Sequence, residues 1–421
     1  ARLEFFKLMD KLELNAPVPA DGAAEEEAPT PSSPALLEGE AALAAVIFSI
    51  ISGFPCGVNS FIPLSSAPAR QLTQAASLSI IIRDILETAG GKSMQESKLL
   101  SGSITKSLLI FALPMIAGNL LQQCYNIADT IIVGRFLGAD ALAAVGSSYT
   151  LMTFLTSIIL GLCMGSGASF SISFGQQDFD RMKSGIFQSF VFIGAVTVVL
   201  NAAVFIGIDG IIWLLRVPGS IIGLMKDYLL IIFAGIIGTF LYNYFAALLR
   251  AVGNSLVPLL FLAAAAVLNI ALDLVFVLVC RWGVEGAAAA TVLAQWLSGI
   301  GTAVYTLVRC PELRARREER RITGAMLREL LSASVLTCLQ QSVMNLGILI
   351  VQGRINSFGP VIMAAFAAAV KIDSFAYMPL QDFGNAFSTF IAQNYGAQQP
   401  ERIRRGIRTA VLLSSVFAVC V

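Results

Sequence analysis

The chain has 421 residues, of which 56% are hydrophobic and only 13% are charged. Soluble domains carry about 25% charged residues, so this composition is typical of a multi-pass membrane protein. The 28 Lys and Arg balance 27 Asp and Glu, there is no histidine, and the seven cysteines form no CxxC pair. These features exclude a basic nucleic-acid-binding surface, a histidine triad and a zinc–histidine site.

Residues 1–93 differ from the rest of the chain. The stretch 1–33 is rich in Ala, Pro and Glu, as disordered segments are. The apolar patch 41–51 is shorter than the ~20 residues that cross a bilayer. Residues 90–93, Gly-Gly-Lys-Ser, have codons that can form a ribosome-binding site just before Met94. We expect either that translation starts at Met94 and 1–93 is upstream sequence, or that 1–93 is a poorly ordered leader.

Long apolar segments follow, joined by short polar connections. They must be helices, because backbone groups in lipid need hydrogen-bond partners within the segment. The predicted spans are 106–133, 140–174, 184–214, 220–250, 255–280, 283–308, 325–356, 360–395 and 405–421. Lys and Arg are concentrated in the connections on the Met94 side, including the solvated basic linker 309–323. The positive-inside rule therefore places that side in the cytoplasm.

An internal repeat relates the two halves of this apolar region. Gln122, Asn126, Gly134 and Arg135 recur 219 positions later as Gln341, Asn345, Gly353 and Arg354. Gly175, Gln177, Arg181 and Gly185 recur 221 positions later as Gly396, Gln398, Arg402 and Gly406. We therefore predict an all-α polytopic membrane protein built from two parallel six-helix repeats. The N-lobe is 94–308, the inter-lobe linker is 309–323, and 324–421 is a partial C-lobe with helices 7 to 9. With about nine of twelve helices, the chain is expected to be a fragment.

Charged residues inside the spans are rare and costly, at roughly 2.5–3.5 kcal/mol each. Asp129 lies deep in the first span. Tyr125 and Gln122 lie one and two turns before it on the same helix face, and Asn126 directly follows Tyr125. We interpret this group as an ion or substrate site. The alternative is an interior polar cluster that only fixes helix packing.

A second polar pair lies in the fifth span. Asn269 and Asp273 are four residues apart and therefore share a helix face. An amide oxygen and a carboxylate suit Na⁺, or a proton acceptor with its hydrogen-bond partner. The alternative is a hydrogen bond between helices. Thr291 follows the small-residue run 286–290, which mainly permits close helix packing.

The eighth span carries further candidates for a substrate-facing role, namely Lys371, Asp373, Gln381 and Asp382. Pro379 and Gly384 predict a bent or broken helix with exposed carbonyl groups there. Lys371 is a possible counter-ion for Asp373 or Asp382, and the sequence leaves open whether its role is substrate-facing or structural.

Several motifs carry a family resemblance. They are Leu113-Pro114, Gln122-Gln123, Tyr125-Asn126, Asp129 and Gly134-Arg135-Phe136-Leu137-Gly138 in the first span, Leu249-Arg250-Ala251-Val252-Gly253-Asn254 with Pro258, and Asn394-Tyr395-Gly396-Ala397. From Ser97 to Val421 the chain resembles the multidrug and toxic compound extrusion (MATE) family. It most resembles the prokaryotic branch with the DNA-damage-inducible and MepA-like exporters.

The resemblance implies twelve helices in two lobes and export of an amphiphilic, often cationic, drug in exchange for Na⁺ or H⁺. It implies a cation site formed by Asp129, Asn269, Asp273 and Thr291, where two repelling carboxylates bind the ion. The cavity candidates are Gln122, Tyr125, Asn126, Lys371, Asp373, Gln381 and Asp382. We expect a monomer in the bacterial cytoplasmic membrane, with no cofactor besides the coupling ion.

Two other functions remain open at this point. A flippase for lipid-linked precursors, from a related superfamily, should have a more cationic cavity, whereas only Lys371 stands out here. A non-transporting scaffold or sensor would not need paired carboxylates on separate helices. An enzyme is not expected, because the sequence contains no nucleophile–base motif.

Overall fold

The computed structural model describes residues 99–215, 217–315, 319 and 323–420. Within them every regular element is a helix, which confirms the all-α prediction. The predictions for residues 1–93, including a start at Met94, lie outside the described residues. Helices are the expected result, since a chain this apolar can satisfy its backbone in lipid only by bonding within each segment.

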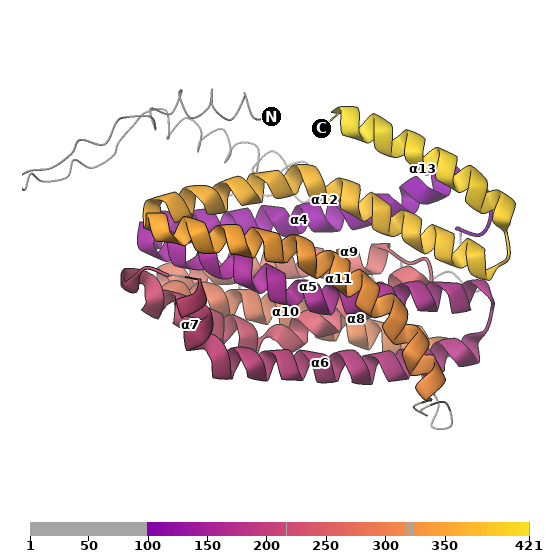
Figure 1. Ribbon diagram of the computed structural model, residues 1–421, viewed down its shortest axis with the longest axis horizontal. Coiled ribbons are helices and arrows are strands. Elements are labelled where there is room, and N and C mark those ends of the chain that lie inside the picture. Colours follow the sequence, from indigo (N-terminus) through magenta and orange to yellow (C-terminus); the bar gives the residue numbers. More distant parts are fainter. Residues whose placement is uncertain (1–98, 216, 316–318, 320–322, 421) are drawn as a thin grey trace, which may run out of the picture. The chain divides into compact units, whose positions relative to one another are not determined.

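The helices follow the predicted spans to within a few residues (Figure 1). They are α4 (Ile104–Leu137), α5 (Ala139–Gly175), α6 (Phe179–Leu214), α7 (Ile222–Ala234), α8 (Ile236–Ala251), α9 (Leu256–Asp273), α10 (Gly283–Arg309), α11 (Gly324–Ile355), α12 (Pro360–Gly396) and α13 (Pro400–Cys420). Short turns complete them, namely η1 (Gly219–Ile221), η2 (Leu274–Val279), η3 (Pro311–Leu313) and η4 (Asn356–Phe358). α7 and α8 together fill one predicted span and meet at an angle of 46°.

Among the described residues, six helices are long and apolar enough to cross a membrane, and the α7–α8 pair can form a seventh span. α12 and α13 occupy the predicted eighth and ninth spans. α6 presents much of its apolar surface outward, including Ile206 and Trp213, as a lipid-facing helix does.

The structure differs from two expectations. Of the bent or broken helix expected at Pro379 and Gly384, the break is absent, because α12 continues past both residues. Neighbouring helices can satisfy the backbone group that a proline frees. The irregular backbone lies instead between α7 and α8 and in the π-helical η2. The linker 309–323 is also not wholly solvated, since Glu319 forms a 3.2 Å ion pair with Lys183 and both side chains are largely buried.

The two halves contact each other mainly through α5, which lies against α11 and α12, while α12 also packs on α4 (Figure 1). Small residues permit this close approach. Gly161 and Gly165, one turn apart on α5, face the backbone of Cys338 and Ser334 on α11. A Cβ atom on either glycine would meet main-chain atoms. This is the small-residue packing that membrane helices use in place of a hydrophobic driving force.

The backbone repeats the pattern seen in the sequence. Gly138 and Gly359 precede α5 and α12 with φ of 91° and 95°. Gln177 and Gln398 follow the same two helices with φ of 60° and 54°, values uncommon for a residue with a side chain. Both pairs are 221 positions apart, as in the sequence repeat. The two copies therefore share turn geometry as well as residue types.

The ends of α5 and α12 cross with reciprocal contacts. A Cβ atom on Gly175 would meet the backbone of Gln393, and one on Gly396 would meet the backbone of Ile172. Gln393 and Ile172 are themselves 221 positions apart. The contact is therefore the same seen from either half, as expected for a crossing on a pseudo-twofold axis.

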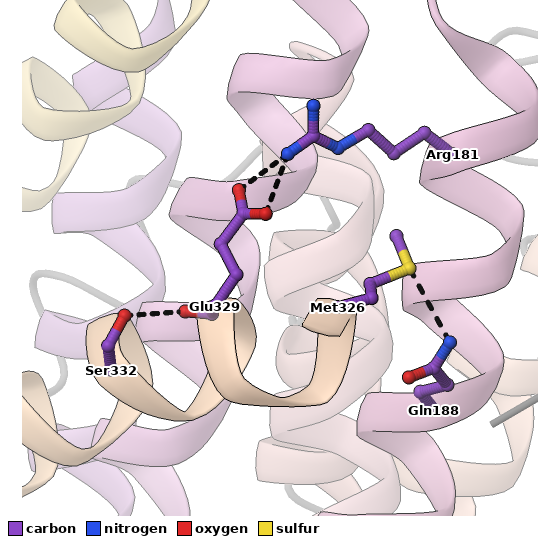
Figure 2. A network of polar contacts seen from close by, with 5 residues as sticks. All are labelled: Arg181, Gln188, Met326, Glu329 and Ser332. Atoms are coloured by element: carbon purple, nitrogen blue, oxygen red, sulfur yellow. Dashed lines mark hydrogen bonds and ion pairs between the residues drawn. The ribbon is translucent and has the colours of Figure 1, made fainter. Parts of the chain in front are cut away.

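An arginine at the start of each repeat's third helix binds the other half. Arg181 on α6 donates from Nη2 to both carboxylate oxygens of Glu329 on α11, at 2.6 and 2.7 Å (Figure 2). The same picture shows Gln188 donating to the sulfur of Met326 at 3.4 Å. Arg402 on α13 instead donates to backbone carbonyl oxygens just before α4, and its guanidinium lies 5.7 Å from the Phe390 ring centre. Those oxygens belong to Leu99, Ser101 and Gly102.

This difference predicts unequal effects of conservative substitutions. The Arg181–Glu329 pair is exposed, with side-chain exposures of 42% and 57%. Exposed ion pairs contribute about 0–1 kcal/mol, so Arg181→Lys should barely change the thermal unfolding temperature. Arg402→Lys should lower it clearly, because lysine cannot bind three carbonyl oxygens with one planar fork. Melting of the purified protein at low and high salt measures both effects. Equal losses in the two variants would contradict the prediction.

Candidate ion and substrate site

Four residues of the predicted cation site come together from three helices. Asp129 on α4, Asn269 and Asp273 on α9 and Thr291 on α10 are all buried, with exposures of 8%, 1%, 0% and 9%. Asn269 Nδ2 lies 3.4 Å from Thr291 Oγ1. Asp129 is close enough to Asp273 for their charges to interact. The one-turn spacing of Asn269 and Asp273 puts both on the face of α9 that meets α4 and α10.

Three acceptor atoms on α9 lack donors among the described residues. Both carboxylate oxygens of Asp273 and Oδ1 of Asn269 are buried without a hydrogen-bond partner among the described residues. A buried polar atom left in this way carries a desolvation cost. Oxygen atoms of this kind fit a hard cation such as Na⁺, or a proton shared between acceptors. The donor set therefore suits the ion that the sequence predicts. No cluster of three or more His, Cys, Asp or Glu side chains occurs in the described part of the chain.

Two features of this group were not predicted from the sequence. η2 begins directly after Asp273 with a π-helical turn, a distortion that is frequent at functional sites. Tyr228 on α7 is buried and interacts electrostatically with both Asp129 and Asp273. The run Leu274–Val279 is uniformly apolar, so no sequence signal marks its irregular backbone.

A small cavity of about 60 Å³ lies beside the carboxylates, within the first half of the structure. Its walls come from α4, α8, α9 and α10, and they are Gln122, Tyr125, Thr239, Tyr242, Asn243, Leu262, Ala265, Asn269, Thr291, Ala294, Gln295 and Ser298. The cavity can hold a few water molecules. Because Asn269 and Thr291 belong to both groups, the cavity and the cation site are continuous.

Sequence reasoning found part of this cavity. Two of the predicted cavity candidates, Gln122 and Tyr125, are among the residues that line it. Thr239 and Gln295 also line the cavity but were not predicted from the sequence. In the structure Thr239 Oγ1 donates a hydrogen bond to Gln295 Oε1 at 2.9 Å. The spacing of Thr291, Gln295 and Ser298 is a helical-face signal that could have identified the α10 wall.

The other predicted residues lie apart from the cavity. Asn126 is half-buried and its carbonyl oxygen accepts from Thr130 at 2.7 Å. Gln381 donates to Gln341 on α11 at 3.0 Å, within the second half. Asp373 is exposed, and the side chain of Lys371 lies outside the described part. Asp382 is buried against α4, where it contacts Asn119.

Comparison with known proteins decides the family. The sequence profile of the MatE family matches residues 114–275 and 333–421. The chain belongs to the MatE family. A relative, the "Probable multidrug resistance protein YpnP" of Bacillus subtilis (strain 168), is 31% identical over 303 residues, which are 72% of this chain and 67% of the relative. The "Probable multidrug resistance protein NorM" of Thermotoga maritima is 26% identical over 323 residues, or 76% of this chain and 69% of that protein.

Two solved transporter structures share the fold. An outward-facing multidrug resistance MATE family transporter of the MOP superfamily superposes with a TM-score of 0.70 at 22% identity, over 77% of this chain and 72% of the other. A MOP superfamily transporter from Pyrococcus furiosus gives 0.68 at 23% identity over the same shares. The family resemblance is therefore confirmed, and the protein is a multi-pass membrane transporter. The flippase and scaffold alternatives are not favoured.

Proposed function

We propose that this MatE protein exports amphiphilic, cationic compounds in exchange for Na⁺ or H⁺. One observation carries the proposal, namely the buried group of oxygen acceptors at Asp273 and Asn269 that opens onto a polar cavity. The names of relatives support the substrate class, since several are multidrug resistance proteins and MepA of Staphylococcus aureus is a multidrug export protein. The protein acts as a monomer in the bacterial cytoplasmic membrane, with the Met94 side and residues 309–323 in the cytoplasm.

The site geometry suggests how ion and drug are coupled. Two neighbouring carboxylates, Asp129 and Asp273, repel each other in a low-dielectric site, and a bound cation relieves that repulsion. Asp129 shares α4 with Gln122 and Tyr125, which line the cavity. An ion that repositions α4 therefore changes the cavity wall. Coupling requires only that ion and drug bind the inward- and outward-facing states with different affinities.

A vesicle assay tests this function and identifies the ion. The full-length protein is reconstituted into liposomes, and transport of ethidium is followed while a Na⁺ gradient or a pH gradient is imposed separately. We expect one gradient to drive ethidium against its concentration, with protein-free vesicles and vesicles without a gradient as controls. Absence of ethidium movement under both gradients would contradict the proposal.

A further inference from the structure

A buried polar network joins the two halves where α11 ends and η4 begins. Asn356, the first residue of η4, donates from Nδ2 to the carbonyl oxygen of Leu215 at 2.8 Å and to Ser147 Oγ at 3.2 Å. Its Oδ1 accepts from Gln352 Nε2 at 2.7 Å, and Gln352 Oε1 accepts from Thr150 Oγ1 at 3.3 Å. Two amide side chains of the second half are thus bonded to α5 and to the residue that follows α6.

The network is closed to water and its hydrogen bonds are complete. Gln352 is 0% exposed, Ser147 and Asn356 are 1% exposed and Thr150 is 5% exposed. Among the described residues, none of these four side chains has a buried polar atom without a hydrogen-bond partner. A buried network is stable when every bond is made, whereas a half-separated one leaves polar atoms unpaired at a desolvation cost. Two arrangements are therefore favoured, one fully bonded and one opened to water.

The two copies of the repeat differ at this corner. The offset between them is 219 up to Arg354 and 221 from Gly359, so the second copy has two extra residues here, within the segment that contains η4. In the first copy Gly138 directly follows α4. Gln352 corresponds to Val133, which is fully buried in an apolar cluster. Because the first copy makes the equivalent turn with an apolar residue, the turn itself does not require the polar network.

We propose that Gln352 and Asn356 are positioning residues for transport, which hold the outer end of the α5–α11 interface closed and release it to water when the protein faces outward. Separating an apolar contact exposes surface at a cost proportional to its area. Hydrogen bonds that are exchanged for bonds to water cost little in comparison. A polar contact at this end is therefore firm when closed and easily hydrated when open. The inference deepens the proposed function and rests on its orientation, with residues 309–323 in the cytoplasm and η4 at the opposite surface.

The test measures the separation of the outer ends directly. The exposed residues Trp213 and Val361, one in each half, are changed to cysteine and spin-labelled in full-length protein without other cysteines, in liposomes. Double electron–electron resonance then gives the distribution of distances between the labels. We expect Asn356→Ala to raise the ratio of open to closed populations roughly tenfold, because the amide makes bonds to three partners in the closed state. Ser357→Ala is the matched control, since this exposed neighbour donates only to Arg354 of its own turn, at 2.7 Å. It should keep the wild-type distribution.

A second variant covers a possible loss of folding in Asn356→Ala. Thr150→Val keeps the shape of the side chain and removes one bond across the interface, so it should shift the distribution in the same direction by about threefold. If every variant that folds keeps the wild-type distribution, the inference is overturned while the proposed function stands. Failure of wild type to move ethidium under either gradient overturns the proposed function instead, and the label distances do not depend on that assay.

Discussion

Replacing Asp129 and Asp273 together with Asn should reduce ion-driven export to the rate of protein-free vesicles while leaving the helices intact. The substitution keeps side-chain shape but removes both charges, so neither Na⁺ nor a proton has a carboxylate to bind. Folding should tolerate it, because a buried neutral amide costs less to desolvate than a buried carboxylate. Far-UV circular dichroism checks the fold, and ethidium transport under an imposed gradient checks the function.

The single variant at Asp273 sharpens this prediction. Asp273 is fully buried, and neither of its oxygens has a donor among the described residues, so Asp273→Asn should raise the thermal unfolding temperature while it lowers transport. Asp180→Asn provides a control at a carboxylate that is 86% exposed. It should leave both quantities unchanged. Undiminished transport in the Asp129→Asn/Asp273→Asn variant would show that these carboxylates do not bind the coupling ion.

Gly175→Ala and Gly396→Ala should each destabilise the protein markedly, by about 1–3 kcal/mol or more. In both cases the new methyl group would meet backbone atoms of the opposite helix, at Gln393 and Ile172 respectively. Backbone cannot move aside as a flexible side chain can, so α5 and α12 must separate. Because the contact is reciprocal, we expect similar losses from the two variants, measured by thermal unfolding in detergent.

Gly384 on α12 offers the matched control for this substitution. A Cβ atom there meets nothing within 4 Å. Gly384→Ala should therefore be neutral or slightly stabilising, since alanine favours a helix over glycine by about 1 kcal/mol. If Gly396→Ala melts at the same temperature as Gly384→Ala, the crossing is not as close as the structure indicates.

The helices could be predicted well because the membrane leaves one local solution for each apolar segment. Asp129 and Asp273 were proposed as site residues for a related reason, because a charge within such a segment is conspicuous. Thr239 gave no such signal, because neutral polar residues in membrane helices commonly serve packing. Gln295 was marked only by its helical spacing from Thr291 and Ser298. Of the bend or break expected at Pro379, no break occurs, since tertiary contacts decide whether a proline interrupts a helix.

Long-range partners could not be predicted from the sequence. Asn119 and Asp382 are 263 positions apart, and no spacing rule links an amide of one span to a carboxylate of another. The repeat indicated that α5 and α12 are equivalent, but not that they touch. The contact depends on both Gly175 and Gly396, since each leaves space for the backbone of the opposite helix.

The reciprocal crossing at Gly175 and Gly396 has a mechanical consequence. When two rigid halves rotate relative to each other, residues at the pivot move little and residues far from it move most. Rocking of the two halves about this crossing would move contacts that lie far from it and leave the glycine contact closed. The crossing would then be a fixed pivot, about which the two halves turn without losing contact.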